Sequence, residues 1–314
     1  MRWIEHGSAQ DWHWGGKLNK LAAPKIAGKG RMKRIAALLI GMLFSFAGLA
    51  AGPGAVRKTI ESSMLLTGTI VVGTEGKVTE YAIDQPEKVA SGVLEFVNRN
   101  VEQWEFEPTL LDGKPMPVRN RMNIRIVANK QENGDFMVRL GGASFLPFKV
   151  EEGSQVSSTK MSPPRYPDSA GRAGATGTAY LIVKVGRDGN VQEVVAEQVN
   201  LRFVASENVM QQAREAFARA SIQAAKQWKF APPVKGEDVD EPYWTVRVPV
   251  DYLMGSRKER KYGQWESYVP GPRHPIPWKS LQDAPGFSPD TMVAGGGVYQ
   301  TGKGLRLLTP LSGG

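Results

Sequence analysis

The sequence of 314 residues contains no cysteine and only three histidines. The absence of cysteine excludes disulfide bonds, thiolate metal sites and a cysteine nucleophile. His274 stands alone in a proline-rich segment, and we find no glycine-rich phosphate loop, paired metal ligands or nucleophile elbow. We therefore expect a protein that is not an enzyme and that has no metal site and no cofactor.

The excess of positive charge is concentrated at the N-terminus. The whole chain has a formal net charge of +9 and a pI of about 9.6. Residues 1–50 hold eight lysines and arginines against two acidic residues, which leaves only +3 for the rest of the chain. Since a nucleic-acid-binding domain is expected to be strongly basic, we expect no nucleic-acid partner.

The N-terminal region predicts export. A lysine-arginine pair at 33–34 is followed by an apolar run at 35–51 that ends in small residues. This pattern is typical of a signal peptide over residues 32–51, cleaved after Ala50. The alternative is a short uncleaved signal anchor, because a membrane span needs about 20 residues. Residues 1–31 are interpreted as a leader extension or a mis-start. The expected location is the periplasm, with anchoring in the inner membrane if the segment at 32–51 is not cleaved.

Two short sequence motifs each occur twice along the chain, in the same order. "VGTEGKV" at 72–78 resembles "VGRDGNV" at 185–191, and "QWEFEP" at 103–108 resembles "QWKFAP" at 227–232. The repetition of both motifs in the same order indicates a duplicated module. The aromatic residues of the second motif are expected to be structural core residues, namely Trp104, Phe106, Trp228 and Phe230.

The second copy predicts its elements most fully. Residues 177–186 alternate as a half-buried strand, Asp188-Gly189 supplies a tight hairpin, and a second strand follows. A helix is expected from Ser206 to about Trp228, with apolar residues on one stripe. Residues 244–254 alternate again, with the odd-numbered side chains from 247 to 251 expected to point outward. The order is β-β-α-β.

The first copy repeats this order in shorter form, with Asp84 expected to cap its helix. The predicted fold class is α+β, with two small β-β-α-β modules at 57–128 and 162–254. Each module is expected to be an antiparallel three-stranded sheet with a helix packed on one face. Residues 129–161 are expected to be a linker with an extra strand. The C-terminal tail, residues 255–314, is rich in proline and glycine and is expected to be extended or disordered.

The second module resembles the C-terminal domain of the TonB family, over about residues 162–253. The resemblance rests on "PPRYPDSAGRAGATGTAYLIVKVGRDGNV" followed by a helix and "KQWKFAPPVKG". The matching positions are Tyr166, Pro167, Ala170, Gly177, Asp188, Gly189, Asn190, Val191, Trp228, Phe230, Pro232 and Gly236. The first module carries the same pattern from its hairpin onward but lacks the Tyr-Pro segment.

This resemblance implies a periplasmic protein that captures the "TonB box" of outer-membrane receptors as an added strand at an exposed sheet edge. The candidate edge is the strand at 245–253, because a proline inside a strand is typical of edges. The peptide-binding residues expected from the resemblance are Tyr166, Pro167, Ala170, Gly171, Arg172, Thr245, Arg247, Pro249 and Asp251.

Three departures leave a second function open. The family has a glutamine where this chain has Gly171, a long proline-rich spacer, and a histidine in its membrane anchor for coupling to the ExbB–ExbD motor. The run at 35–51 has no histidine, and the chain has no such spacer. The alternative is therefore a non-transducing periplasmic adaptor or scaffold that binds other envelope proteins. The sequence predicts no oligomeric state.

Overall fold

The computed structural model describes residues 60–131, 133–255, 261–278, 283–295 and 297–311. They belong to a single compact unit. The predicted leader at 1–31 and signal segment at 32–51 lie outside the described residues.

The first sheet is built around one long strand. β1 (Glu61–Val72) pairs along one side with β5 (Val118–Lys130), which in turn pairs with β6 (Phe136–Pro147). Along its other side β1 pairs with β12 (Glu266–Tyr268) near its start and with β2 (Val78–Ile83) near its end. All these pairs are antiparallel. The three-stranded sheet predicted for this module is too small, because β6 and a tail strand extend it to five strands.

One helix covers the first core. α3 (Ser91–Val101) turns its buried residues Val97 and Val101 toward the apolar face of the sheet. The helix begins later than predicted, because Asp84 does not cap it. The carboxylate of Asp84 instead accepts a hydrogen bond from Thr67 Oγ1 at 2.6 Å, and a 3-10 turn, η1 (Pro86–Lys88), comes first.

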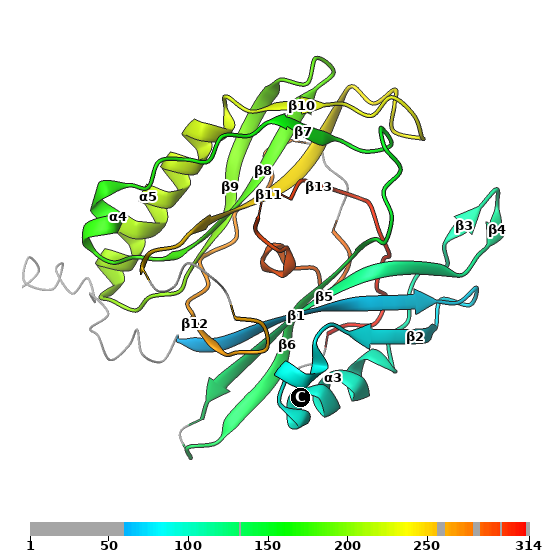
Figure 1. Ribbon diagram of the computed structural model, residues 1–314, viewed down its shortest axis with the longest axis horizontal. Coiled ribbons are helices and arrows are strands. Elements are labelled where there is room, and N and C mark those ends of the chain that lie inside the picture. The colour runs from blue at the N-terminus through cyan, green and yellow to red at the C-terminus, as the bar shows by residue number, and fades with distance from the viewer. Residues whose placement is uncertain (1–59, 132, 256–260, 279–282, 296, 312–314) are drawn as a thin grey trace, which may run out of the picture. The chain divides into compact units, whose positions relative to one another are not determined.

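The second sheet has the order β13-β11-β8-β9. β8 (Gly177–Gly186) and β9 (Val191–Leu201) form the predicted hairpin, and β11 (Tyr243–Tyr252) pairs with β8. β13 (Tyr299–Gln300) comes from the tail and adds a fourth strand, where three were predicted. Helix α5 (Glu207–Ala225) lies along β8 and β9 (Figure 1).

A second apolar core lies between α5 and this sheet. Strand alternation places Leu181, Val183 and Val248 on the helix side, where they pack with Phe217 of α5 and with Trp228. Trp104 belongs to the first core and Trp228 to the second, and both are at most 3% exposed.

The recurring motifs have matching geometry in the two modules. The amide of Phe106 donates to the carbonyl of Gly76 at 2.7 Å, and the amide of Phe230 donates to the carbonyl of Gly189 at 2.9 Å. Both hairpin glycines have a positive φ, +77° and +74°. A Cβ atom at either glycine would lie 2.1 Å from the carbonyl oxygen of the paired phenylalanine. The two motifs of each module therefore depend on each other. The hairpin turn needs glycine both for its positive φ and because the phenylalanine carbonyl of the second motif lies too close for a Cβ atom.

Short elements complete the fold. They are β3 (Leu110–Leu111), β4 (Lys114–Pro115), β7 (Ser157–Lys160), α4 (Asp168–Arg172), β10 (Lys229–Ala231) and η3 (Pro289–Thr291). β3 pairs with β4, and β7 with β10.

The described part of the tail is ordered against both sheets. η3 contacts β5 and β6 of the first sheet and β9 and β11 of the second. Its residues Asp290 and Thr291 are almost completely buried. β12 and β13 pair with one sheet each. The expectation of an extended or disordered tail is therefore wrong for these residues, because the tail supplies strands and buried side chains that the periodicity did not reveal.

Candidate peptide-binding site

The predicted contact residues at 166–172 lie together beside the C-terminal end of β11. The ring of Tyr166 packs edge-on against Phe217 and Tyr252, with centroids 5.9 and 5.4 Å apart. Its hydroxyl donates a hydrogen bond to the carbonyl of Ala175. Burial raises the pKa of Tyr166, against the opposing charge of Arg202. The tyrosine thus holds the segment against the second core.

The rest of this segment differs in exposure. Ala170 is buried, Pro167 and Gly171 are half-buried, and Arg172 is exposed. A Cβ atom at Gly171 would lie 3.7 Å from the Met254 side chain, which is an ordinary contact distance. The position where the family carries a glutamine therefore has room for a side chain.

An open groove of about 700 Å³ runs between residues 160–169 and the outer face of α5. Its lining combines small side chains of the helix with exposed cations from both sides. These residues are Ala216, Ala220, Ala224, Lys160, Arg165 and Arg219.

The predicted contact residues on β11 are less accessible than expected. Thr245, Arg247 and Pro249 are buried, and Asp251 is half-buried. Asp251 accepts a hydrogen bond from Thr178 Oγ1 at 2.5 Å. The expectation that the odd-numbered side chains face solvent is wrong, because the tail covers this face of the sheet.

Arg247 lies at the centre of a buried ion network. Its guanidinium donates to Glu197 at 2.7 and 3.1 Å and to Asp283 at 2.8 and 2.9 Å. Arg273 contacts the same two carboxylates, and Phe287 stacks on Arg247 with 4.5 Å from the guanidinium carbon to the ring centroid. Burial alone would lower the pKa of Arg247, but Glu197 and then Asp283 raise it. The side chain fastens the tail to the sheet.

The edge of β11 is paired with the tail. Val246 and Arg247 lie opposite Gln300 and Tyr299 of β13. The amide of Thr301 also donates to the carbonyl of Thr245 at 2.9 Å. The edge predicted to accept a peptide therefore already carries a strand over residues 245–247.

The opposite edge of the sheet is also covered by the tail. Leu201 of β9 and Val269 exchange two backbone hydrogen bonds, of 3.0 and 2.9 Å. The amide of His274 donates to the carbonyl of Glu197 at 2.7 Å, and Gly271 bonds to the Asn200 side chain. Tail segments thus lie on both edge strands of the second sheet.

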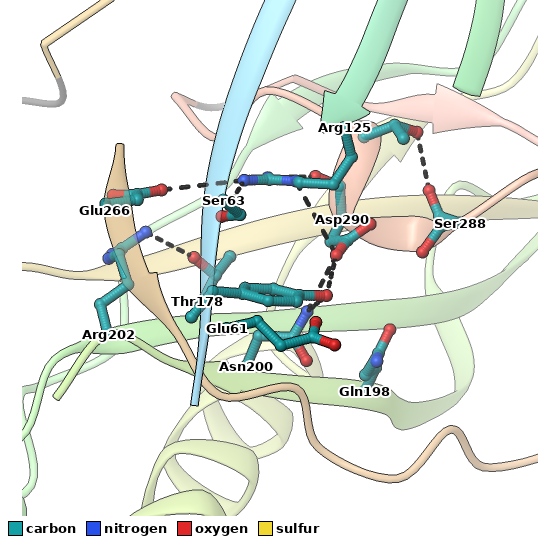
Figure 2. A network of polar contacts seen from close by, with 12 residues as sticks. Glu61, Ser63, Arg125, Thr178, Gln198, Asn200, Arg202, Glu266, Ser288 and Asp290 are labelled. Atoms are coloured by element: carbon teal, nitrogen blue, oxygen red, sulfur yellow. Dashed lines mark hydrogen bonds and ion pairs between the residues drawn. The ribbon is translucent and has the colours of Figure 1, made fainter. Parts of the chain in front are cut away.

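A second buried polar network joins the first sheet to the tail and to β9 (Figure 2). Arg125 of β5 donates to Ser63 at 3.1 Å and to the backbone carbonyl of Asp290 at 2.5 Å. The Asp290 carboxylate accepts hydrogen bonds from Tyr268 and from Asn200. Burial, then the charge of Asp290, raises the pKa of Tyr268. We interpret this network as structural, since its members bond to one another.

Sequence reasoning missed the partners of Arg247 and Arg125. Glu197 lies at a register shift of β9, which breaks the alternation that would have placed it on one face. No clear signal marked it, since β9 also contains Gln192, Glu193, Gln198 and Asn200. Asp283 and Asp290 lie in the tail, where no periodic pattern marks a buried residue.

The described residues contain neither a metal-binding cluster nor a membrane-spanning helix. No group of three or more histidine, cysteine, aspartate or glutamate side chains there could hold a metal ion. No helix in the described ranges is long and apolar enough to cross a membrane.

Comparison with known proteins points to one family. Protein TonB from two strains of Xanthomonas campestris pv. campestris is 38% identical to this chain over 100 residues, which is 32% of this chain and 38% of the relative. Protein tonB2 from Pseudomonas aeruginosa is 30% identical over 91 residues, 29% of this chain and 28% of the relative. This chain thus spans well under half the length of these relatives. No family model matches it.

A solved structure, the Pseudomonas aeruginosa TonB C-terminal domain, matches 34% of this chain and 92% of that domain at 20% identity. The TM-score is 0.21. The fold defines the chain as an α+β protein, mostly strands with few helices. About a third of it is similar to TonB, so the predicted resemblance to the TonB C-terminal domain family is confirmed for that part of the chain.

Proposed function

We propose that this is a TonB-like envelope protein that binds segments of outer-membrane receptors by strand addition and takes part in energy-dependent transport across the outer membrane. The observation that carries the proposal is the similarity to TonB over 100 residues. Strand addition draws affinity from backbone hydrogen bonds and specificity from side chains at alternate positions. The protein is not an enzyme in this proposal, and it uses no cofactor.

The receptor segment is proposed to bind along β11 and to reach the segment at 166–172. Tyr166 supports this continuity, because its ring touches Tyr252 at the end of β11. Gly171 and Arg172 follow on α4, half-buried and exposed respectively. The side chains of Thr245, Arg247 and Pro249 are buried, so their part in binding is limited to the backbone.

We further propose that residues 57–128 are a degenerate copy of the second module. The matching contacts of Gly76 with Phe106 and of Gly189 with Phe230 support this origin, since two independent folds would have no reason to share them. Duplication also agrees with the order of β1, β2, α3 and β5 beside that of β8, β9, α5 and β11.

The second candidate is an adaptor that binds other envelope proteins without transmitting force. The pairing of both edges of the second sheet with the tail favours it, because a filled edge accepts a new strand less readily. The fate of the segment at 32–51 separates the candidates. N-terminal sequencing of envelope fractions should find a chain that begins near Ala51 if the segment is cleaved, whereas an intact anchor supports a transducer.

Calorimetric titration with synthetic peptides of receptor TonB boxes tests the main proposal. The sharpest variant is Gly171→Gln, which restores the family's residue where the backbone leaves room for it. One added hydrogen bond, about 0.5–1.5 kcal/mol, should tighten binding about threefold to tenfold. Gly92→Gln on α3 is the matched control, because the backbone there also leaves room for a side chain and a Cβ would meet nothing within 4 Å. The absence of binding by both the unmodified chain and Gly171→Gln would favour the adaptor.

A further inference from the structure

We propose that β13 is an exchangeable internal occupant of the β11 edge, so that a receptor strand must replace it in order to bind. This inference rests on the proposed function, because it concerns the same edge. It adds a regulatory step, in which the chain's own tail competes with the partner.

β13 occupies the place where an added strand would lie. It is antiparallel to β11, with Val246 opposite Gln300 and Arg247 opposite Tyr299. Thr301 extends the ladder through its hydrogen bond to the carbonyl of Thr245. The next outward position is Pro249, which has no amide hydrogen to offer. The backbone groups from 245 to 247 are therefore the ones for which the tail and a receptor segment compete.

β13 is held between two fixed points by flexible sequence. Before it, Met292 is 4% exposed, and after it, Leu305 and Leu307 are buried in the first core. The described residues between these points include glycines at 295, 297 and 302. Because glycine has the widest conformational freedom, this stretch can leave the edge while both fixed points stay in place.

Besides the backbone ladder, Val298 packs against the second core, the Thr301 hydroxyl donates to the Thr245 carbonyl at 3.2 Å, and Gln300 makes the remaining side-chain contacts with the body. The Gln300 side chain accepts a hydrogen bond from the amide of Val156 at 2.9 Å and donates to Asp238 at 2.6 Å. Lys303 also pairs with Asp238. A cavity of about 150 Å³ lies beside β13, lined in part by Tyr299, Gln300 and Arg247. A strand of two residues with a cavity at its side lacks the close packing of β8 or β5.

The internal strand lowers the apparent affinity for any added strand. The observed affinity equals the intrinsic affinity multiplied by the fraction of molecules whose edge is open. Weakening β13 without touching β11 should therefore tighten peptide binding. Gln300→Ala does this, because it removes both side-chain hydrogen bonds and leaves the backbone of β11 intact.

The test uses the full chain and two peptides. The first is a fluorescent peptide of residues 297–303, the chain's own β13 sequence, and the second is a receptor TonB-box peptide. We expect the β13 peptide to bind Gln300→Ala about tenfold more tightly than the unmodified chain. Thr309→Val is the matched control, since Thr309 ties the tail to Glu105 of the first module through a 2.7 Å hydrogen bond. It should leave binding of the β13 peptide unchanged.

Amide hydrogen exchange gives a readout that needs no peptide. Residues two apart in a strand present their amides on the same side, so the Arg247 amide faces β13, as the Thr245 carbonyl does. It should exchange about tenfold faster in Gln300→Ala. The amide of Val246, which faces β8, should keep its rate. Equal acceleration of both amides would overturn the inference, because β13 would then not leave separately.

The two peptides separate this inference from the proposed function. Tighter binding of the β13 peptide to Gln300→Ala than to the unmodified chain, with no binding of the receptor peptide to either, supports the exchangeable strand and rejects the receptor function. Equal binding of the receptor peptide to the unmodified chain and Gln300→Ala rejects the exchangeable strand and keeps the receptor function. If the β13 peptide binds Gln300→Ala no more tightly than it binds the unmodified chain, the inference is overturned.

Discussion

The Nε atom of Arg247 donates a hydrogen bond to Glu197 Oε2 over 2.7 Å, and the two side chains are only 3% and 1% exposed. Removing one partner of a buried ion pair leaves the other charge without compensation in a medium of low polarity. Glu197→Ala removes one of the two carboxylates that Arg247 and Arg273 share and leaves both cations with Asp283 alone. We expect this variant to lower the free energy of unfolding by about 3–5 kcal/mol, measured by denaturant titration.

Glu193→Ala is the matched control for this prediction. Glu193 lies on the same strand and pairs with Lys184 at 2.9 Å, but its side chain is 49% exposed. Exposed pairs contribute about 0–1 kcal/mol, so the control should change stability little. An equal loss of unfolding free energy in Glu197→Ala and Glu193→Ala would show that the buried Arg247 network stabilises the protein no more than an exposed ion pair does.

The hairpin glycines give a second prediction. Gly76→Ala and Gly189→Ala should each destabilise the protein strongly, for two reasons. Each position has a positive φ, and each new Cβ would meet a phenylalanine carbonyl oxygen at 2.1 Å. The carbonyl belongs to the backbone and cannot turn aside without moving the chain. Thermal melting of the purified variants measures the effect.

Gly113→Ala separates the two causes. Gly113 has φ +74°, but a Cβ there meets nothing within 4 Å. Its substitution should cost only the left-handed strain, about 1–2 kcal/mol. If Gly76→Ala and Gly189→Ala cost no more than Gly113→Ala, the close approach of the phenylalanine carbonyl is unimportant for stability.

How far the sequence predicts this fold depends on how local the signal is. The hairpin at Gly189, the helix that follows and the position of β11 are set by neighbouring residues, and the sequence indicated these elements correctly. The tail was misjudged, because β12, η3 and β13 are two or three residues long and their partners lie far along the chain.

The candidate site shows the same limit. Arg247 was placed on the correct strand and face, but its burial depends on Glu197, Arg273 and Asp283, which reach it from other segments. A pattern of period two reports which face a side chain occupies. It does not report what covers that face, and here the covering segment has no periodicity of its own.

A third prediction concerns alkaline pH. Burial raises the pKa of Tyr252 from 10.0 to about 12, although its hydrogen bond with Ser221 lowers it. The folded state therefore holds this proton more tightly than the unfolded state does. The contribution to stability is complete below about pH 10 and is lost as the pH rises toward about 12. We expect the free energy of unfolding to fall over this interval.

Tyr252→Phe tests the origin of that fall. The variant removes one ionising group, so its stability should decline less steeply between about pH 10 and 12, whatever its stability at neutral pH. Other buried tyrosines, including Tyr268, have a raised pKa and keep part of the slope. Identical slopes in Tyr252→Phe and the unmodified protein would contradict the assignment to Tyr252.

The last prediction concerns cooperativity between the two cores. Duplication alone predicts that each module unfolds by itself. The tail opposes this, because Val269 belongs to the second core while Leu305 and Leu307 belong to the first. Arg125 of the first sheet is also joined to Asp290 of the tail. We therefore expect both modules to unfold in one transition.

Trp228→Ala measures this coupling. Loss of a buried aromatic side chain costs about 3–5 kcal/mol, and the damage is confined to the second core. Amide exchange should show that β5 and β8 lose protection together, with equal opening free energies. Trp265→Ala is the control, since this side chain is 40% exposed and should contribute little. If β8 opens in Trp228→Ala while β5 stays protected, the modules fold independently, and the buried contacts of the tail do not transmit stability between them.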